Sequence, residues 1–117
     1  MPLETVADLV SLLQEHPLLE PAQLNEVRRA LAARFPDPVA LARELIQRNW
    51  LTPYQVNQLF HGRGADLVLG NYVLLTRLGE GGMGQVFKAR HRKLGKVVAL
   101  KLLRKDRLAG PEAIRRF

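Results

Sequence analysis

Cysteine is missing from this chain of 117 residues, which excludes a disulfide framework and a thiolate zinc site. A reducing, cytoplasmic setting is compatible with that composition. Long apolar runs are missing as well, since a membrane helix needs about 20 apolar residues in a row and no run approaches that length. The start MPLETVADLV also lacks the basic-then-apolar order of a signal peptide. We therefore expect a cytoplasmic protein with no membrane segment in this portion.

Aromatic residues are scarce, at 6% of the sequence, and the charge is unevenly distributed. Residues 1–65 carry six arginines and seven acidic side chains, whereas residues 66–117 carry twelve basic and four acidic ones. The net charge of +7 therefore belongs to the second half. A basic domain can mark a nucleic-acid-binding surface. No aromatics interleave with these basic residues for base stacking, so we expect no nucleic-acid partner and interpret the charge as a solvated face with phosphate-facing lysines.

The first half of the chain predicts four helices. Apolar residues recur there at three-to-four spacing, and prolines mark where segments begin or stop. The helices are expected over residues 4–15, 21–35 and 38–50, with a fourth from residue 53 onward. Asp37 and Thr52 precede the prolines that open the last two helices, and Gly62 or Gly64 ends the fourth.

The two halves of this helical region resemble each other. Residues 19–27 align with residues 51–59 at an offset of 32, and the same offset places Leu9 and Leu13 on Leu41 and Leu45. Chance similarity is the alternative, since short patterns of leucine, proline and glutamine are common. A duplicated helical hairpin would expose one apolar stripe in each copy, so the two hairpins are expected to pack into one four-helix unit.

Chemistry is harder to assign to the helices. His16 and His61 are far apart in sequence and have no clustered carboxylates or thiols beside them, so we expect no metal site there. Trp50 and Tyr54 are candidates either for core packing or for anchoring a protein partner.

Beyond residue 65 the hydrophobic pattern changes to a period of two. Strands are expected over residues 72–78, 85–91 and 97–103, and Gly110-Pro111-Glu112 is typical of a helix start. The predicted fold class is α+β, with a helical unit at 1–64, a linker at 65–71 and a second domain at 72–117.

The most informative motif lies between the first two of these strands. Gly79, Gly81 and Gly84 stand at GxGxxG spacing with Val86 after them, and Val98-Ala99-Leu100-Lys101 follows one hairpin later. Glycines allow backbone N–H groups to approach phosphate oxygens closely. A Rossmann fingerprint would open a helix here and add an acidic residue, and a Walker A loop would need Ser or Thr after Gly95-Lys96. Neither pattern fits.

Strand, glycine turn, strand and V-A-L-K in this order resemble the start of a bacterial serine/threonine protein kinase of the eukaryotic-like type. The segment 50–55 followed by 69–72 is similar to the helical region ahead of the kinase domain in planctomycete-type kinases. The resemblance implies an incomplete kinase N-lobe of three antiparallel strands and the start of a helix. It also implies ATP as the ligand. The residues implied to bind it are Leu78, Gly79, Glu80, Gly81, Gly82, Met83, Gly84, Gln85, Val86, Ala99 and Lys101.

Within that resemblance, the glycines cover the phosphates, Leu78, Val86 and Ala99 line the adenine pocket, and Lys101 pairs with the α and β phosphates. The family's magnesium ligands and catalytic aspartate have no counterpart before Phe117. We therefore expect an N-terminal fragment that does not turn over alone, with Mg²⁺ and protein substrates belonging to a full-length parent. The alternative is a non-catalytic module in which the helices bind a protein partner and the hairpin is vestigial.

Overall fold

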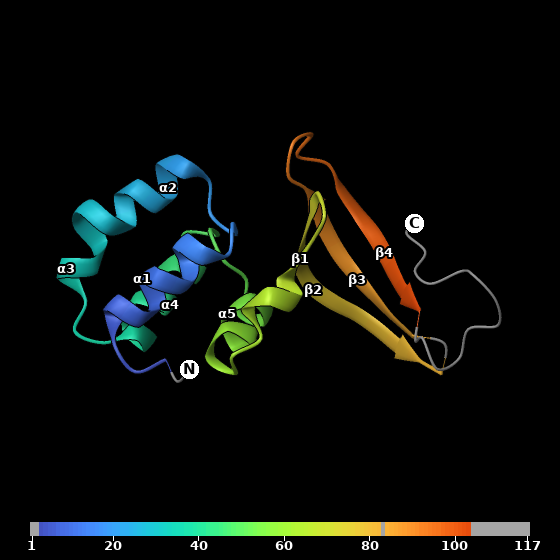
Figure 1. Cartoon of the computed structure of the whole chain (residues 1–117), viewed down its shortest axis with the longest axis horizontal. Helices are drawn as coiled ribbons and strands as arrows, with labels where there is room; N and C mark the ends of the chain where they lie inside the picture. Colours follow the sequence, from blue (N-terminus) through green and yellow to red (C-terminus); the bar gives the residue numbers. More distant parts are fainter. Residues whose placement is uncertain (1–2, 83, 104–117) are drawn as a thin grey trace. The chain divides into compact units, whose positions relative to one another are not determined.

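The computed structural model describes residues 3–82 and 84–103 and confirms an α+β chain of helices followed by an antiparallel sheet (Figure 1). The chain divides between Val68 and Leu69 into two compact units, which we call the helical unit and the sheet unit. Within the described ranges, no helix combines the length and apolar character that crossing a bilayer requires.

The helical unit contains the four helices expected from the sequence. The first is α1 (Val6–Glu15), and the third and fourth are α4 (Pro38–Gln47) and α5 (Pro53–Phe60). The second helix continues through α2 (Pro21–Glu26), η1 (Val27–Leu31) and α3 (Ala32–Arg34). Its middle part, η1, is one turn of π-helix, which the sequence did not indicate. A short 3₁₀ turn, η2 (Gly64–Leu67), follows α5.

Side-chain caps explain where these helices begin. The Thr5 hydroxyl accepts from the Asp8 amide at the start of α1, and Asp37 and Thr52 cap α4 and α5 in the same manner. At Thr52 a capping box is completed because the Gln55 side chain accepts from the Thr52 amide at 2.9 Å. Gly62, with a φ of +73°, follows the C-cap of α5 and ends that helix.

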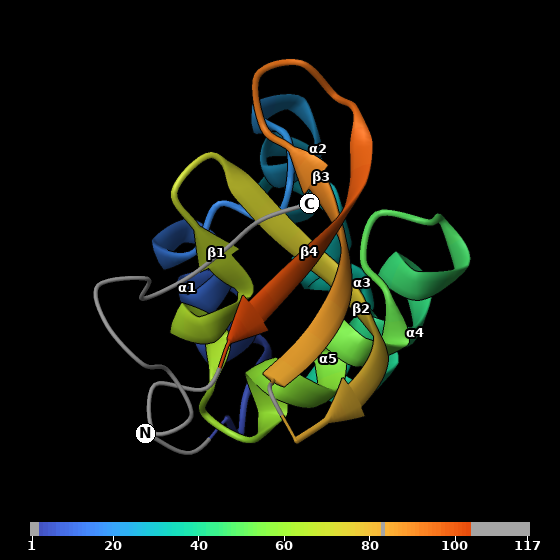
Figure 2. The same cartoon turned by 90° about the vertical axis from the view of Figure 1, so that its right-hand side faces the viewer.

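Leucine dominates the core of the helical unit, where α1 packs against α3 and α4 (Figures 1 and 2). Every side chain of this core is less than 10% exposed: Leu9, Leu13, Leu18, Leu19, Val27, Leu31, Leu41, Ala42, Leu45, Leu51, Leu59 and Leu67. Leu9 and Leu13 of α1 are as fully buried, to within 1%, as Leu41 and Leu45 of α4, their counterparts at the offset of 32. Burial of these stripes provides the main stabilisation of short helices such as these.

The sheet unit is built from consecutive antiparallel pairs. The strands are β1 (Val68–Leu69), β2 (Tyr72–Gly81), β3 (Gly84–His91) and β4 (Val97–Leu103), in the order β1-β2-β3-β4. The three longer strands are those expected from the sequence, and β1 adds a fourth that is too short to give an alternating pattern. The segment predicted as a linker, 65–71, includes most of η2 and all of β1. The expected helix start at 110–112 lies outside the described residues.

The β3–β4 turn is held by one histidine. The backbone amides of Lys93 and Leu94 both donate to Nδ1 of His91, at 3.2 and 3.1 Å, and Gly95 takes a φ of +72°. Nδ1 must therefore be the unprotonated ring nitrogen. These contacts fix where β4 begins, and with it the register of Lys101.

Candidate glycine-rich phosphate flap

The glycine motif forms the tip of the β2–β3 hairpin. Gly81 pairs with Gly84, Glu80 with Gln85, and Gly79 with Val86. Gly82 lies in the turn between the two strands, and Met83, also predicted as a site residue, lies outside the described residues. The glycines therefore stand at the end of a two-stranded ribbon, the arrangement that the sequence pattern predicted.

Two irregularities shape β2 on the way to this tip. The register shifts between Leu74 and Thr76 and again between Arg77 and Gly79, so that the register passes over Leu75 and Leu78. An extra residue of this kind bends a strand and increases its twist. Leu78, expected to line an adenine pocket, lies in the second bulge and is 59% exposed.

A row of paired residues links the glycines to the lysine. Val86 of β3 pairs with Gly79 of β2 on one side and with Lys101 of β4 on the other. Directly paired residues project to the same face of a sheet, and alternate residues of a strand share that face. Ala99 therefore lies on the face of Val86 and Lys101, two residues before the lysine. We call this face, marked by Gly79, Gly84, Val86, Ala99 and Lys101, the glycine–lysine face.

Away from the hairpin tip, the opposite face carries apolar, buried side chains. Leu74, Phe87, Ala89 and Leu100 alternate with the residues of the glycine–lysine face and are at most 4% exposed. On the glycine–lysine face, by contrast, Val86 and Lys101 are half-buried and Ala99 is exposed. Around Val86, Ala99 and Lys101, the glycine–lysine face is thus the more accessible of the two.

Two predicted site residues fall elsewhere. Glu80 and Gln85 pair with each other, and the alternation places them on the face opposite Val86. Glu80 instead lies 3.4 Å from Arg77 in an exposed ion pair. Lys88, which no motif singled out, pairs with Ala99 and adds a second cation to the glycine–lysine face. The alternating sequence pattern does not distinguish Lys88 from the other residues on its side of β3. Only the strand register shows that Lys88 lies beside Ala99.

The glycines of the loop differ in what requires them. Gly84 has a φ of +154°, and a Cβ there would overlap the carbonyl oxygen of Leu102, so the β3–β4 pairing itself demands glycine. At Gly79, Gly81 and Gly82 an added Cβ would meet no atom within 4 Å, and none of the three has a positive φ of the kind that favours glycine. Neither packing nor backbone conformation explains these three glycines. Their bare backbone is suited to close approach by something outside the chain.

This arrangement supplies backbone amides and an ammonium group. Amides at a glycine turn and a nearby lysine suit the oxygens of a phosphate chain, and apolar Val86 and Ala99 suit a flat ring. In residues 3–82 and 84–103, no three side chains capable of metal binding cluster together. The described residues therefore hold a candidate binding surface, and their individual roles remain predictions.

Comparison with known proteins gives partial matches of one kind. The chain is 51% identical over 51 residues to a probable serine/threonine-protein kinase of Clostridium perfringens, which covers 43% of this chain and 7% of that protein. It is 52% identical over 46 residues to a serine/threonine-protein kinase of Myxococcus xanthus, covering 39% of this chain and 8% of that protein. No known family profile matches the chain. No solved structure matches it either.

The chain therefore carries a segment similar to bacterial serine/threonine kinases and spans less than a tenth of the length of these relatives. The planctomycete-type resemblance and the origin of the helical unit lie beyond that similarity.

Proposed function

We propose that the sheet unit is the nucleotide-covering part of a serine/threonine protein kinase domain and that its ligand is ATP. The observation that carries the proposal is the set of three glycines at the hairpin tip, Gly79, Gly81 and Gly82, which nothing in the described residues requires. A ligand whose phosphates come against the backbone gives them a reason. Support also comes from the register, which aligns Gly79, Val86 and Lys101 in one row, and from the similarity to two bacterial kinases.

In this proposal the amides of Gly79 to Gly82 cover the phosphate chain and Lys101 pairs with its α and β phosphates. Val86 and Ala99, with Leu78 from the bulge, provide apolar surface for adenine. Positioning and charge neutralisation are the main contributions of a protein to phosphoryl transfer. The sheet unit supplies part of both.

We assign the transfer itself to a longer, cytoplasmic protein that contains these residues. That protein would carry γ-phosphate from ATP to the hydroxyl groups of serine or threonine in protein substrates. Mg²⁺ belongs to that longer protein, because the family's metal ligands and catalytic aspartate have no counterpart in this sequence. For the same reason the 117-residue chain should bind ATP weakly and should not turn it over.

The decisive test substitutes Lys101 in the longer protein. Removing one preorganised cation from a phosphoryl-transfer site costs on the order of 100-fold or more in rate. We expect Lys101→Met to lower phosphate transfer to a protein substrate by that factor. Lys88→Met is the matched control, since Lys88 lies on the same face but has no assigned role, and its activity should stay within about two-fold. Full activity of Lys101→Met, with an unchanged circular dichroism spectrum, would contradict the proposal.

A further inference from the structure

The two helical hairpins carry grooves at equivalent positions. Helix α4 has the bounds of α1 shifted by 32 residues, from Val6–Glu15 to Pro38–Gln47, and the prolines that open α2 and α5 differ by the same offset. Each hairpin has a groove between its own two helices. Both grooves lie within the helical unit and include none of the residues proposed to bind the nucleotide.

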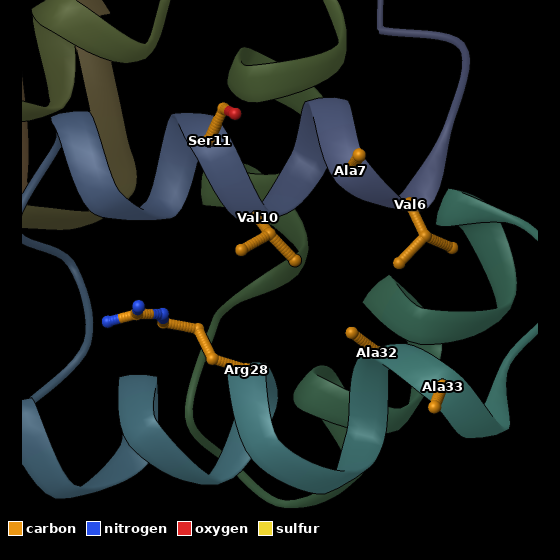
Figure 3. Close-up of a pocket in the computed structure, with 7 residues that line it drawn as sticks. All are labelled: Val6, Ala7, Val10, Ser11, Arg28, Ala32 and Ala33. Carbon is orange, nitrogen blue, oxygen red and sulfur yellow. The ribbon is translucent and has the colours of Figure 1, made fainter.

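The first groove, of about 580 Å³, runs between α1 and the helix that follows it. Val6 and Val10 of α1 point toward this second helix, whose Ala32 points back toward them (Figure 3). Arg28, from the π-helical turn η1, extends along the space between the helices (Figure 3). Turns of π-helix recur at functional sites, because they shift the side chains that follow them around the helix. This groove thus has an apolar wall and one cation.

The second groove, of about 310 Å³, lies between α4 and α5. Val39, Ala42 and Ile46 of α4 face Val56 and Phe60 of α5 across it, and Arg43 is its cation. At the offset of 32 its residues Val39, Ala42, Arg43 and Phe60 correspond to Ala7, Val10, Ser11 and Arg28, all of which line the first groove. Four lining positions therefore correspond between the two grooves, with the arginine supplied by the second helix in one and by the first helix in the other.

The arginines of these grooves differ from the others on the helices. Arg29 and Arg48 form ion pairs with Glu26 and Glu44, and Arg34 lies over the ring of Phe35. In the described part of the chain, Arg28 and Arg43 have neither an ion pair nor a ring contact. The described residues that line the two grooves include no acidic side chain. Each groove thus presents an unpaired positive charge beside apolar side chains that are mostly half-buried.

We propose that each groove binds an acidic amphipathic helix of a protein partner, so that one helical unit takes two such helices. Apolar anchors of the partner at i, i+3 and i+7 would lie against the valine and alanine side chains, as in other helix-in-groove complexes. A carboxylate of the partner would pair with Arg28 in the first groove and with Arg43 in the second. Charge complementarity selects this occupant, because a basic helix would meet an arginine of its own sign in both grooves.

The test uses the full chain and a fluorescein-labelled synthetic helix with a leucine stripe flanked by glutamates. Fluorescence anisotropy gives the dissociation constant, and a titration at high concentration gives the stoichiometry. Arg28→Ala and Arg43→Ala should each weaken the affected site about two- to five-fold, as expected for a partly exposed charge pair. Arg29→Ala, next to Arg28 but outside the groove, is the matched control and should leave binding unchanged.

A second pair of variants adds repulsion. Ser11 and Asn57 are exposed and line the first and second groove respectively, so Ser11→Asp and Asn57→Asp should fold normally. Each places a carboxylate where the partner's carboxylate would lie, and each should weaken binding at its own site more than the alanine change does. A peptide with glutamine in place of glutamate should bind every variant equally. Amide chemical shifts should change most at Val10 and Val56, which separates binding in the grooves from nonspecific attraction of an acidic peptide to the basic sheet unit.

Four results would overturn the proposal. They are equal binding of the glutamate and glutamine peptides, a loss with Arg29→Ala as large as with Arg28→Ala, shift changes confined to the sheet unit, and saturation at one peptide per chain. Concentration-dependent self-association that perturbs Val10 and Val56 without peptide would also overturn it, because the occupant would then be a second copy of this chain.

Discussion

The loop at the tip of the β2–β3 hairpin contains one glycine that the fold requires, and substitution should separate it from its neighbours. Alanine at Gly84 would have to adopt a φ of +154°, and its Cβ would overlap the Leu102 carbonyl oxygen. A sparsely populated backbone conformation costs about 1–3 kcal/mol, and a weakened hydrogen bond between β3 and β4 adds about 1 kcal/mol. We expect Gly84→Ala to lower the free energy of unfolding of the sheet unit by about 2–4 kcal/mol.

Gly81→Ala is the matched comparison, since Gly81 pairs directly with Gly84. Its added Cβ meets no atom within 4 Å. Alanine also restricts the unfolded chain, so the free energy of unfolding should stay constant or rise by up to about 1 kcal/mol. In the longer protein, however, the same change should weaken ATP binding, because the methyl group would stand between the backbone and the phosphates.

Stability of the sheet unit is best measured by hydrogen exchange of the β3 and β4 amides, because the two units need not unfold together. The reasoning is refuted if Gly81→Ala destabilises these amides as much as Gly84→Ala does. It is also refuted if Gly84→Ala leaves their exchange unchanged, since the overlap with Leu102 would then have no energetic consequence.

Three further predictions concern the helical unit. Thr52→Ala removes the hydroxyl that caps α5 and should cost about 1 kcal/mol in urea unfolding, whereas Thr52→Ser, which keeps the cap, should cost less than half of that. Gly64→Ala places a Cβ 2.6 Å from the His16 ring and should destabilise the unit by about 1–3 kcal/mol, a loss that a smaller residue at His16 should relieve. The pKa of Asp8 is held below its usual 3.8, mainly because its carboxylate accepts from the backbone amides of Glu4 and Thr5. Its stabilising contribution should therefore be present above pH 3.8 and lost as the pH falls through the lower, folded pKa, which NMR titration of the Asp8 carboxyl carbon measures. A pKa at or above 3.8 would contradict that hydrogen bonding.

Local chemistry explains why the sequence predicted the helices so closely. The N-caps Asp37 and Thr52, each followed by proline, announce a helix start within four residues of sequence. The π turn at Val27–Leu31 has no such signal, because its five residues, VRRAL, are ordinary helix formers. The first groove depends on that turn and on α1, which lies far from it in the sequence. Neither groove could have been predicted from composition or periodicity.

For the sheet, too, the sequence predicted some features and missed others. Alternation and the glycine spacing predicted β2, β3 and β4 and the order in which the glycines and Lys101 follow one another. They did not show that Leu75 and Leu78 form bulges, nor that Glu80 and Gln85 lie on the face opposite Val86. The motif alone does not show which of its glycines the fold requires. The distinction between Gly84 and the others comes from the Leu102 carbonyl, a backbone atom on a strand that begins beyond the motif.

The offset of 32 residues gives the helical unit an internal reference. Leu13 and Leu45 occupy matching positions on α1 and α4 and are at most 1% exposed, so truncation of either should be equally costly if the hairpins are energetically alike. Gln23 and Gln55 break the pattern: both side chains accept from an N-cap amide at 2.9 Å, but only Gln55 is buried. The Gln55 side chain is withdrawn from water, whereas the Gln23 side chain stays near the surface. The conformation of the second hairpin is therefore more strictly determined than that of the first. Each hairpin can therefore serve as the internal control for the other, because the same sequence pattern occurs twice with different degrees of burial.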